Sequence, residues 1–295
     1  MVSNAWHSSL YSCGRRTIHE YCEFVGGDVI LIKAAQFIAF KDHARLAFLE
    51  EMTSHLAEFS PPLYKTLGRE RLSAVVREGV ARAERYGFTN RGPIRLFLEL
   101  MLIFGSGFDD DPQYAWAGET LRREDFFNQM FKAGRLEHLA NEHLEKVQGP
   151  ENGNGQRALL RLEELTGRDD LVFSRASLKQ DVLRALDLIF PSKLECVGVA
   201  AVGNIVQRAE RLSDEVFGKD NSRAVVVLTI LKFFFGVKCG DDPLYPWIGA
   251  TLRDPRITHR ATRAVRLERK AVTWLRAVNA SWRGTGLDVP EELNR

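Results

Sequence analysis

The strongest constraint on this chain is a thirteen-residue motif that it contains twice. The first copy, from Asp110 to Arg122, reads Asp-Asp-Pro-Gln-Tyr-Ala-Trp-Ala-Gly-Glu-Thr-Leu-Arg. The second, from Asp241 to Arg253, reads Asp-Asp-Pro-Leu-Tyr-Pro-Trp-Ile-Gly-Ala-Thr-Leu-Arg. The two copies are 131 positions apart, and the match continues upstream without a gap to Gly87 and Gly218. We therefore expect an internal duplication, which would place two related units in one chain.

Helical periodicity dominates both halves, because apolar residues recur every three or four positions and so fall on one face of a helix. In the first half this pattern predicts helices over Lys33–Phe59, Arg69–Tyr86, Ile94–Phe104 and Arg123–Val147. In the second half it predicts helices over Leu178–Phe190, Val199–Phe217, Ser222–Phe235 and Ile257–Trp282. Pro61 and Pro191 break the chain after the first helix of each half, since proline lacks the backbone N–H and disfavours helical geometry before it.

These patterns predict an all-α protein made of two tandem helical units and a basic C-terminal helix. The expected boundaries are an N-terminal extension (1–28), a first unit (29–147), a glycine-rich linker (148–156) and a second unit (157–295). Within the second helix of each unit, the letters Arg-Ala-Glu-Arg occur at 82–85 and again at 208–211. If the two units are aligned on these letters, the second unit has five more residues before Gly218 than the first has before Gly87.

The repeated motif invites a catalytic or metal-binding interpretation, because paired aspartates lie beside aromatic residues. Its candidate residues are Asp110, Asp111, Pro112, Tyr114 and Trp116, with Asp241, Asp242, Pro243, Tyr245 and Trp247 in the second copy. We favour a structural role: Asp-Pro is a typical helix start, with the carboxylate as N-cap and proline in the first turn. A duplicated active site tends to diverge in one copy, whereas a structural motif is needed in both. We therefore expect no catalytic, cofactor-binding or metal-ligating residues, with a metal-dependent enzyme using these loops as the alternative.

Charge is distributed unevenly along the chain. The formal net charge is only +2, yet nine Arg and Lys residues stand against two acids between Arg253 and Arg283. Five of them are candidates for binding a partner: Arg256, Arg260, Arg263, Arg266 and Lys270. Nucleic-acid binding through this helix is a second alternative, disfavoured because there is no recognised nucleic-acid fold and no run of stacking aromatic residues.

No apolar run approaches the ~18 residues of a membrane span, and the N-terminus lacks the order of a signal peptide. The expected location is the cytoplasm, where the four cysteines would be reduced thiols.

Five segments of the first half carry a resemblance to a known family. They are Lys33–Phe37, Met52–Leu56 with Phe59, Ala83–Phe88, Leu100–Gly105, and Phe108-Asp109-x-Asp111-Pro112-x-x-Ala115-Trp116. This pattern resembles a family of small helical proteins encoded beside effectors of bacterial type VI secretion systems. The resemblance covers 30–122, and 177–253 as a diverged copy. It implies a non-enzymatic protein-binding module, an immunity protein or an effector chaperone or adaptor, whose partner is a secreted toxin encoded nearby.

Overall fold

The computed structural model describes residues 34–150, 153–166, 173–219 and 221–282. In these ranges the chain forms twelve α-helices and two short 3-10 helices, with no strand, so the predicted all-α class is confirmed. The predicted N-terminal extension (1–28) lies outside the described residues. From residue 46 on, the described residues belong to one compact unit.

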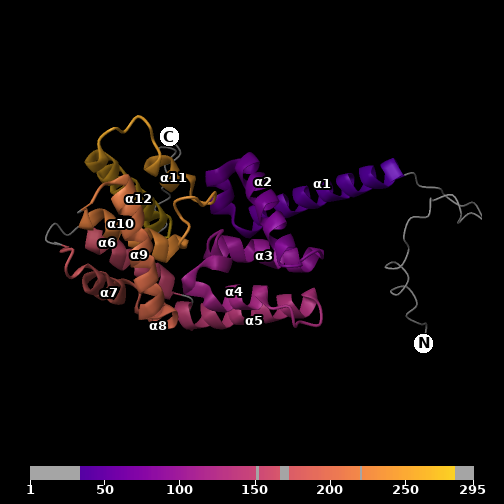
Figure 1. Ribbon diagram of the computed structural model, residues 1–295, viewed down its shortest axis with the longest axis horizontal. Coiled ribbons are helices and arrows are strands. Elements are labelled where there is room, and N and C mark those ends of the chain that lie inside the picture. The colour runs from indigo at the N-terminus through magenta and orange to yellow at the C-terminus, as the bar shows by residue number, and fades with distance from the viewer. Residues whose placement is uncertain (1–33, 151–152, 167–172, 220, 283–295) are drawn as a thin grey trace, which may run out of the picture. The chain divides into compact units, whose positions relative to one another are not determined.

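The helices follow one another through short connections (Figure 1). In chain order they are α1 (Ala34–Phe59), α2 (Pro61–Arg85), α3 (Arg91–Phe104), α4 (Ala115–Arg122), α5 (Gln129–Gln148), α6 (Asn154–Thr166), α7 (Leu178–Ile189), α8 (Pro191–Val197), α9 (Val199–Val216), α10 (Ser222–Phe235), α11 (Pro246–Leu252) and α12 (Arg260–Trp282). The 3-10 helices η2 (Phe108–Asp110) and η3 (Pro112–Tyr114) lie between α3 and α4.

Several helix bounds correspond at the sequence offset of 131. Helix α3 spans 91–104 and α10 spans 222–235, so that both ends correspond. Helix α5 begins at Gln129 and α12 at Arg260, and α4 and α11 begin at Ala115 and Pro246. The two halves thus present the same order of α-helices from α3 to α5 and from α10 to α12, although 3-10 helices lie only between α3 and α4 among the described residues.

The second helix of each half is divided at a glycine. Helix α2 is kinked at Gly68 (φ 74°, ψ 168°), and Gly198 (φ 82°, ψ 153°) separates α8 from α9. The stretch from Pro61 to Arg85 and the stretch from Pro191 to Val216 differ in length by one residue. The predicted insertion of five residues is therefore wrong. The prediction aligned the two helices on the shared letters Arg-Ala-Glu-Arg. In the structure, the buried positions of α2 and α9 instead correspond at an offset of 130.

Two other expectations about helices need correction. The helix predicted from Arg123 begins only at Gln129, and Phe127 and Met130, which fit the apolar period of the predicted helix, are exposed. On α1, Met52 and Leu56 are buried as predicted, whereas Phe37 and Phe40 are exposed.

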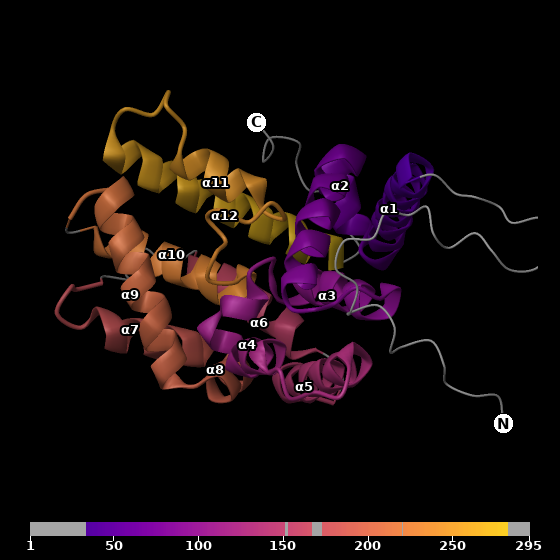
Figure 2. The ribbon, with the colours of Figure 1, turned by 45° about the vertical axis from the view of Figure 1, so that its right-hand side comes forward.

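Each half has its own hydrophobic core, and each core includes a residue from the other half. The first core is built from α2, α3, α4, α5 and the C-terminal part of α1, and it contains Leu244 of the second motif. The second is built from α6, α7, α9, α10, α11 and α12 and contains Val147 from the end of α5. In Figure 2, the purple and magenta helices α2–α5 gather together, as do the orange and yellow helices α7–α12.

Candidate functional site

The two Asp-Asp-Pro loops meet and bond to each other's half in a reciprocal way. Asp111 Oδ1 accepts the backbone N–H of Gln113 at 2.9 Å, and its Oδ2 accepts that of Val237 at 2.6 Å. Asp242 Oδ1 accepts the N–H of Leu244 at 2.9 Å, and its Oδ2 accepts that of Ser106 at 2.8 Å. Val237 is 131 positions after Ser106, so the pattern is the same in both directions. We call this arrangement the reciprocal aspartate lock.

Two glycines make the lock possible. Gly105 and Gly236 end α3 and α10 with φ of 94° at both, a conformation that other residues rarely adopt. A Cβ atom on Gly105 would lie 2.5 Å from the Phe235 carbonyl oxygen, and one on Gly236 would lie 3.2 Å from that of Phe104. The ends of the two helices thus approach too closely for a side chain, which brings Ser106 and Val237 within reach of the opposite aspartate.

The first aspartate of each motif binds the arginine that ends it. Arg122 Nη2 donates to Asp110 Oδ1 at 2.7 Å and to the Asp109 carbonyl at 3.2 Å. Arg253 donates to Asp241 Oδ1 at 2.5 Å and to the Gly240 carbonyl at 3.1 Å. Lys238 also donates to Asp110 at 3.0 Å, and this bond is the main reason that the pKa of Asp110 is lowered.

The remaining motif residues pack. Asp111 caps η3 with Pro112 in its first turn, which confirms the predicted helix start in the first copy. In the second copy this prediction is wrong, because Asp242 is followed by a turn that begins at Pro243, and α11 begins only at Pro246. Tyr114 and Trp247 are buried, whereas Trp116 and Tyr245 are half-buried. Among the described residues, no group of three His, Cys, Asp or Glu side chains is placed to hold a metal ion. Burial raises the pKa of both Asp111 and Asp242, and backbone N–H groups occupy their oxygens.

A buried ion pair distinguishes the first half from the second. Arg82 Nε donates to Asp109 Oδ2 at 2.8 Å, its Nη2 donates to Oδ1, and Tyr86 donates to Oδ2 at 2.7 Å. The corresponding positions of the second half hold Leu212, Phe217 and Gly240. A Cβ on Gly240 would lie 3.8 Å from Leu212 Cδ2, so these positions also adjoin one another. An ion pair in one half thus stands where the other half has an apolar contact.

The predicted basic residues do not form one free stripe. Arg256 precedes α12 and binds Asp254 through Nε at 3.0 Å and Nη2 at 3.1 Å. Arg263 donates to the Asp254 and Ile257 carbonyls, and Arg266 lies 3.9 Å from the Asp254 carboxylate. Arg260 is exposed at the start of α12. Arg253, Arg256, Arg266 and Lys270 nevertheless line one cavity of about 320 Å³.

The fold also brings together groups that no sequence pattern associates. Cys196 Sγ lies 3.3 Å from His143 Nδ1, and the Lys193 ammonium donates to the Phe233 carbonyl at 2.5 Å beside Tyr114. Burial lowers the pKa of His143 to about 4 and that of Lys193 to about 8, and it raises the pKa of the Cys196 thiol. Thiol and imidazole are therefore both neutral at pH 7, unlike the thiolate that a nucleophilic cysteine requires.

Phe127 is the most exposed large apolar residue among the described residues, and with Met130 and Phe131 it forms a group that we call the Phe127 cluster. Their exposed fractions are 88%, 54% and 65%, and the two rings make an edge contact at 6.0 Å. Asn128 caps α5 by accepting the N–H groups of Met130 and Phe131 at 2.9 and 3.1 Å. Gln129 accepts those of Thr89 and Asn90 at 2.7 and 2.9 Å, so the backbone under the cluster is fixed.

Comparison with known proteins gives no relative: the chain matches no protein-family model, no curated protein and no solved structure. Among the described helices, none combines the length and the apolar character needed to cross a bilayer.

Proposed function

We propose that the chain arose by internal duplication and consists of two related helical units. Three kinds of observation support this origin: the matched bounds of α3 with α10, the shared backbone conformation of Gly105 and Gly236, and the reciprocal bonds of Asp111 and Asp242. The lock resembles the interface of a symmetric dimer, in which residue i of one subunit contacts residue j of the other and the reverse also holds. On this proposal the repeated motif joins the units, and function resides where they differ.

We propose that the protein is a non-enzymatic protein-binding module of the cytoplasm. The observation that carries this proposal is the Phe127 cluster, because aromatic and methionine side chains are enriched in protein interfaces and a fixed backbone lowers the entropy cost of binding. The second half provides an internal control. Its matched positions are Thr258, Ala261 and Thr262, so this place in the fold is also occupied by small side chains.

For the identity of the partner, the proposal relies on the sequence resemblance to proteins encoded beside type VI secretion effectors. The partner is then a secreted toxin encoded nearby, and the protein acts as its immunity protein or as a chaperone or adaptor. An immunity protein must rescue cells that express the toxin domain alone. A chaperone must instead be required for the effector to accumulate or to be exported.

The test is co-purification of the protein with the products of its neighbouring genes. The triple variant Phe127→Thr/Met130→Ala/Phe131→Thr carries the residues of the second half and should lose capture while its unfolding transition stays unchanged. The matched control Thr258→Ala/Thr262→Ala should capture as well as the wild type. Undiminished capture by the triple variant would exclude the Phe127 cluster, and failure of the wild type with every neighbour would contradict protein binding itself.

A further inference from the structure

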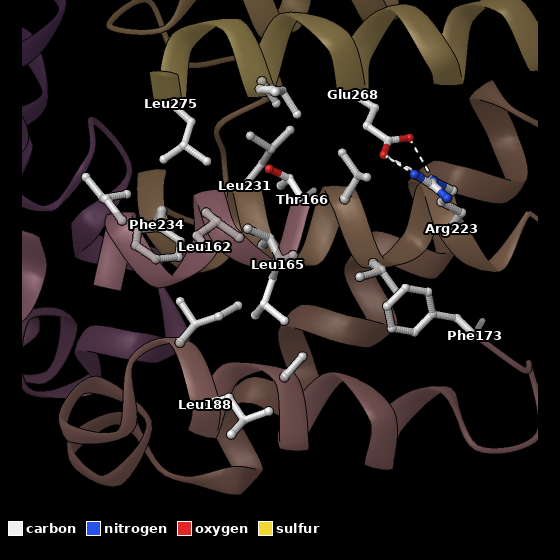
Figure 3. A pocket seen from close by; sticks show the side chains of 18 of the residues that line it. Leu162, Leu165, Thr166, Phe173, Leu188, Arg223, Leu231, Phe234, Glu268 and Leu275 are labelled. Atoms are coloured by element: carbon white, nitrogen blue, oxygen red, sulfur yellow. Dashed lines mark hydrogen bonds and ion pairs between the residues drawn. The ribbon is translucent and has the colours of Figure 1, made fainter. Parts of the chain in front are cut away.

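A cavity of about 300 Å³ lies within the second half, between α6, α7, α10 and α12 (Figure 3). Its walls are almost wholly apolar and include Leu162, Leu188, Leu231, Phe234 and Leu275. A pocket of this size is at the lower end of the range of about 300–1,000 Å³ that small-molecule sites occupy, and apolar walls with a few polar groups are typical of such sites.

Two ion pairs of the described residues border the cavity. Arg223 of α10 donates to Glu268 of α12 from Nε at 2.9 Å and from Nη2 at 2.6 Å (Figure 3). Arg184 and Asp181 of α7 also line it, but their charged atoms are 3.8 Å apart, which is too long for a hydrogen bond. The Arg184 side chain is 76% exposed, so its guanidinium can turn toward an anion at the rim without breaking a strong contact.

The first half shows that the fold does not require this apolar lining. The wall residues Val226 and Ile230 of α10 correspond to Arg95 and Glu99 of α3, which form an ion pair with Nε and Oε1 2.9 Å apart. Val272 of α12 corresponds to Asn141 of α5. Within the residues that the structure describes, this apolar lining is therefore particular to the second half.

We propose that this cavity binds one fatty acid of about ten to twelve carbons, with the chain among the leucines and the carboxylate at Arg184. The chain length follows from the volume, because a methylene group occupies roughly the space of a water molecule. We expect a ligand with a single carboxylate because only one of the two guanidinium groups at the rim is weakly paired. Arg223 is already bound by Glu268, whereas Arg184 makes no hydrogen bond to Asp181. This site is independent of the Phe127 cluster and of the proposed protein partner.

The test is titration of the full-length protein with dodecanoate below its micelle-forming concentration, followed by calorimetry and by tryptophan fluorescence, to which Trp274 in the cavity lining contributes. We expect saturable one-to-one binding. Val272→Phe and Ala185→Phe fill the cavity from opposite walls and should each weaken binding at least about tenfold. Asn141→Phe places the same ring at the matched position of the first half and should leave binding unchanged.

Arg184→Gln should weaken dodecanoate binding about tenfold while leaving dodecanol binding unchanged. Absence of dodecanoate binding by the wild type would overturn the proposal. So would full binding by both filled variants when their unfolding transitions match that of the wild type. Equal dodecanoate affinity of the wild type and Arg184→Gln would overturn the carboxylate anchor.

Discussion

Asp109→Ala is expected to be among the most destabilising single changes in the chain, because it removes the carboxylate that neutralises Arg82. The side chains of Arg82 and Asp109 are only 8% and 1% exposed, so water cannot replace the lost partner. Breaking a buried ion pair by removing one member costs about 3–5 kcal/mol. The Ser106 carbonyl, which accepts from Arg82 Nη1, remains but carries no compensating charge. The nearest remaining carboxylate is Asp110, which lies 4.0 Å from Arg82 Nη2, is 46% exposed and already binds Arg122 and Lys238, so it compensates only weakly.

The second half supplies the rescue. Its matched residues are introduced by the triple variant Arg82→Leu/Tyr86→Phe/Asp109→Gly, which exchanges the ion pair for the apolar contact of Leu212 and Gly240. Replacing a buried ion pair by apolar residues is often neutral or stabilising, and the added glycine costs about 0.5–1 kcal/mol. We therefore expect the triple variant to lie within about 1 kcal/mol of the wild type.

The measurement is equilibrium urea unfolding, followed by circular dichroism and tryptophan fluorescence. Asp109→Gly alone is the matched control, because it carries the same glycine with Arg82 retained, and it should be at least as unstable as Asp109→Ala. The reasoning is refuted if Asp109→Ala costs less than about 1 kcal/mol. It is also refuted if the triple variant is no more stable than Asp109→Gly.

Three further predictions concern stability. The pKa of His143 is about 4 in the folded state against 6.5 for the unperturbed side chain, so the unfolded state binds more protons between these two pH values. Acidification from pH 6.5 to 4 should therefore lower the free energy of unfolding by up to about 3 kcal/mol. His143→Gln should lack this loss, and parallel pH profiles of the two proteins would contradict the prediction. In urea unfolding, Gly105→Ala should cost about 2–5 kcal/mol, because φ is positive at this residue and the added Cβ overlaps the Phe235 carbonyl. It should cost more than Gly236→Ala, whose Cβ has more space. Gly134→Ala is the control: this residue lies within a helix with open space around it, and the change should stabilise slightly. Trp247→Ala should cost about 3–5 kcal/mol and half-buried Trp116→Ala clearly less, and equal losses in thermal unfolding would show that burial does not set the difference.

Local features of the fold were predictable from the sequence. The helices, their breaks at Pro61 and Pro191, and the capping of η3 by Asp111 depend on residues close in the chain, which periodicity and helix-start chemistry describe. The bond from Val237 to Asp111 was not predictable, because 126 positions separate the two residues and no local pattern indicates the pairing. The sequence therefore predicted that the motif is structural without showing what it joins.

The Phe127 cluster and the cavity were missed for a related reason. Phe127 and Met130 fit the apolar period of a helix expected to begin at Arg123, but α5 begins at Gln129 and leaves them exposed. The cavity requires side chains from four helices, and an apolar period looks the same whether the face packs fully or leaves a space. The wrong prediction of a five-residue insertion had another cause. It aligned identical residues at 82–85 and 208–211, whereas the correct alignment follows the buried positions of the two helices, which only the structure reveals.

Whether the Asp-Asp-Pro loops lock the two halves together is tested most directly by urea unfolding of Asp111→Ala, Asp242→Ala and the double variant. Each single change removes two buried hydrogen bonds from backbone N–H groups to a carboxylate. Part of that loss is offset, because alanine avoids the free-energy cost of burying a carboxylate. We expect each to cost about 2–4 kcal/mol, and the double variant to cost less than their sum because both bonds hold the same pair of helix ends. Wild-type stability of both single variants, together with loss of partner capture, would instead show that the loops are a binding site.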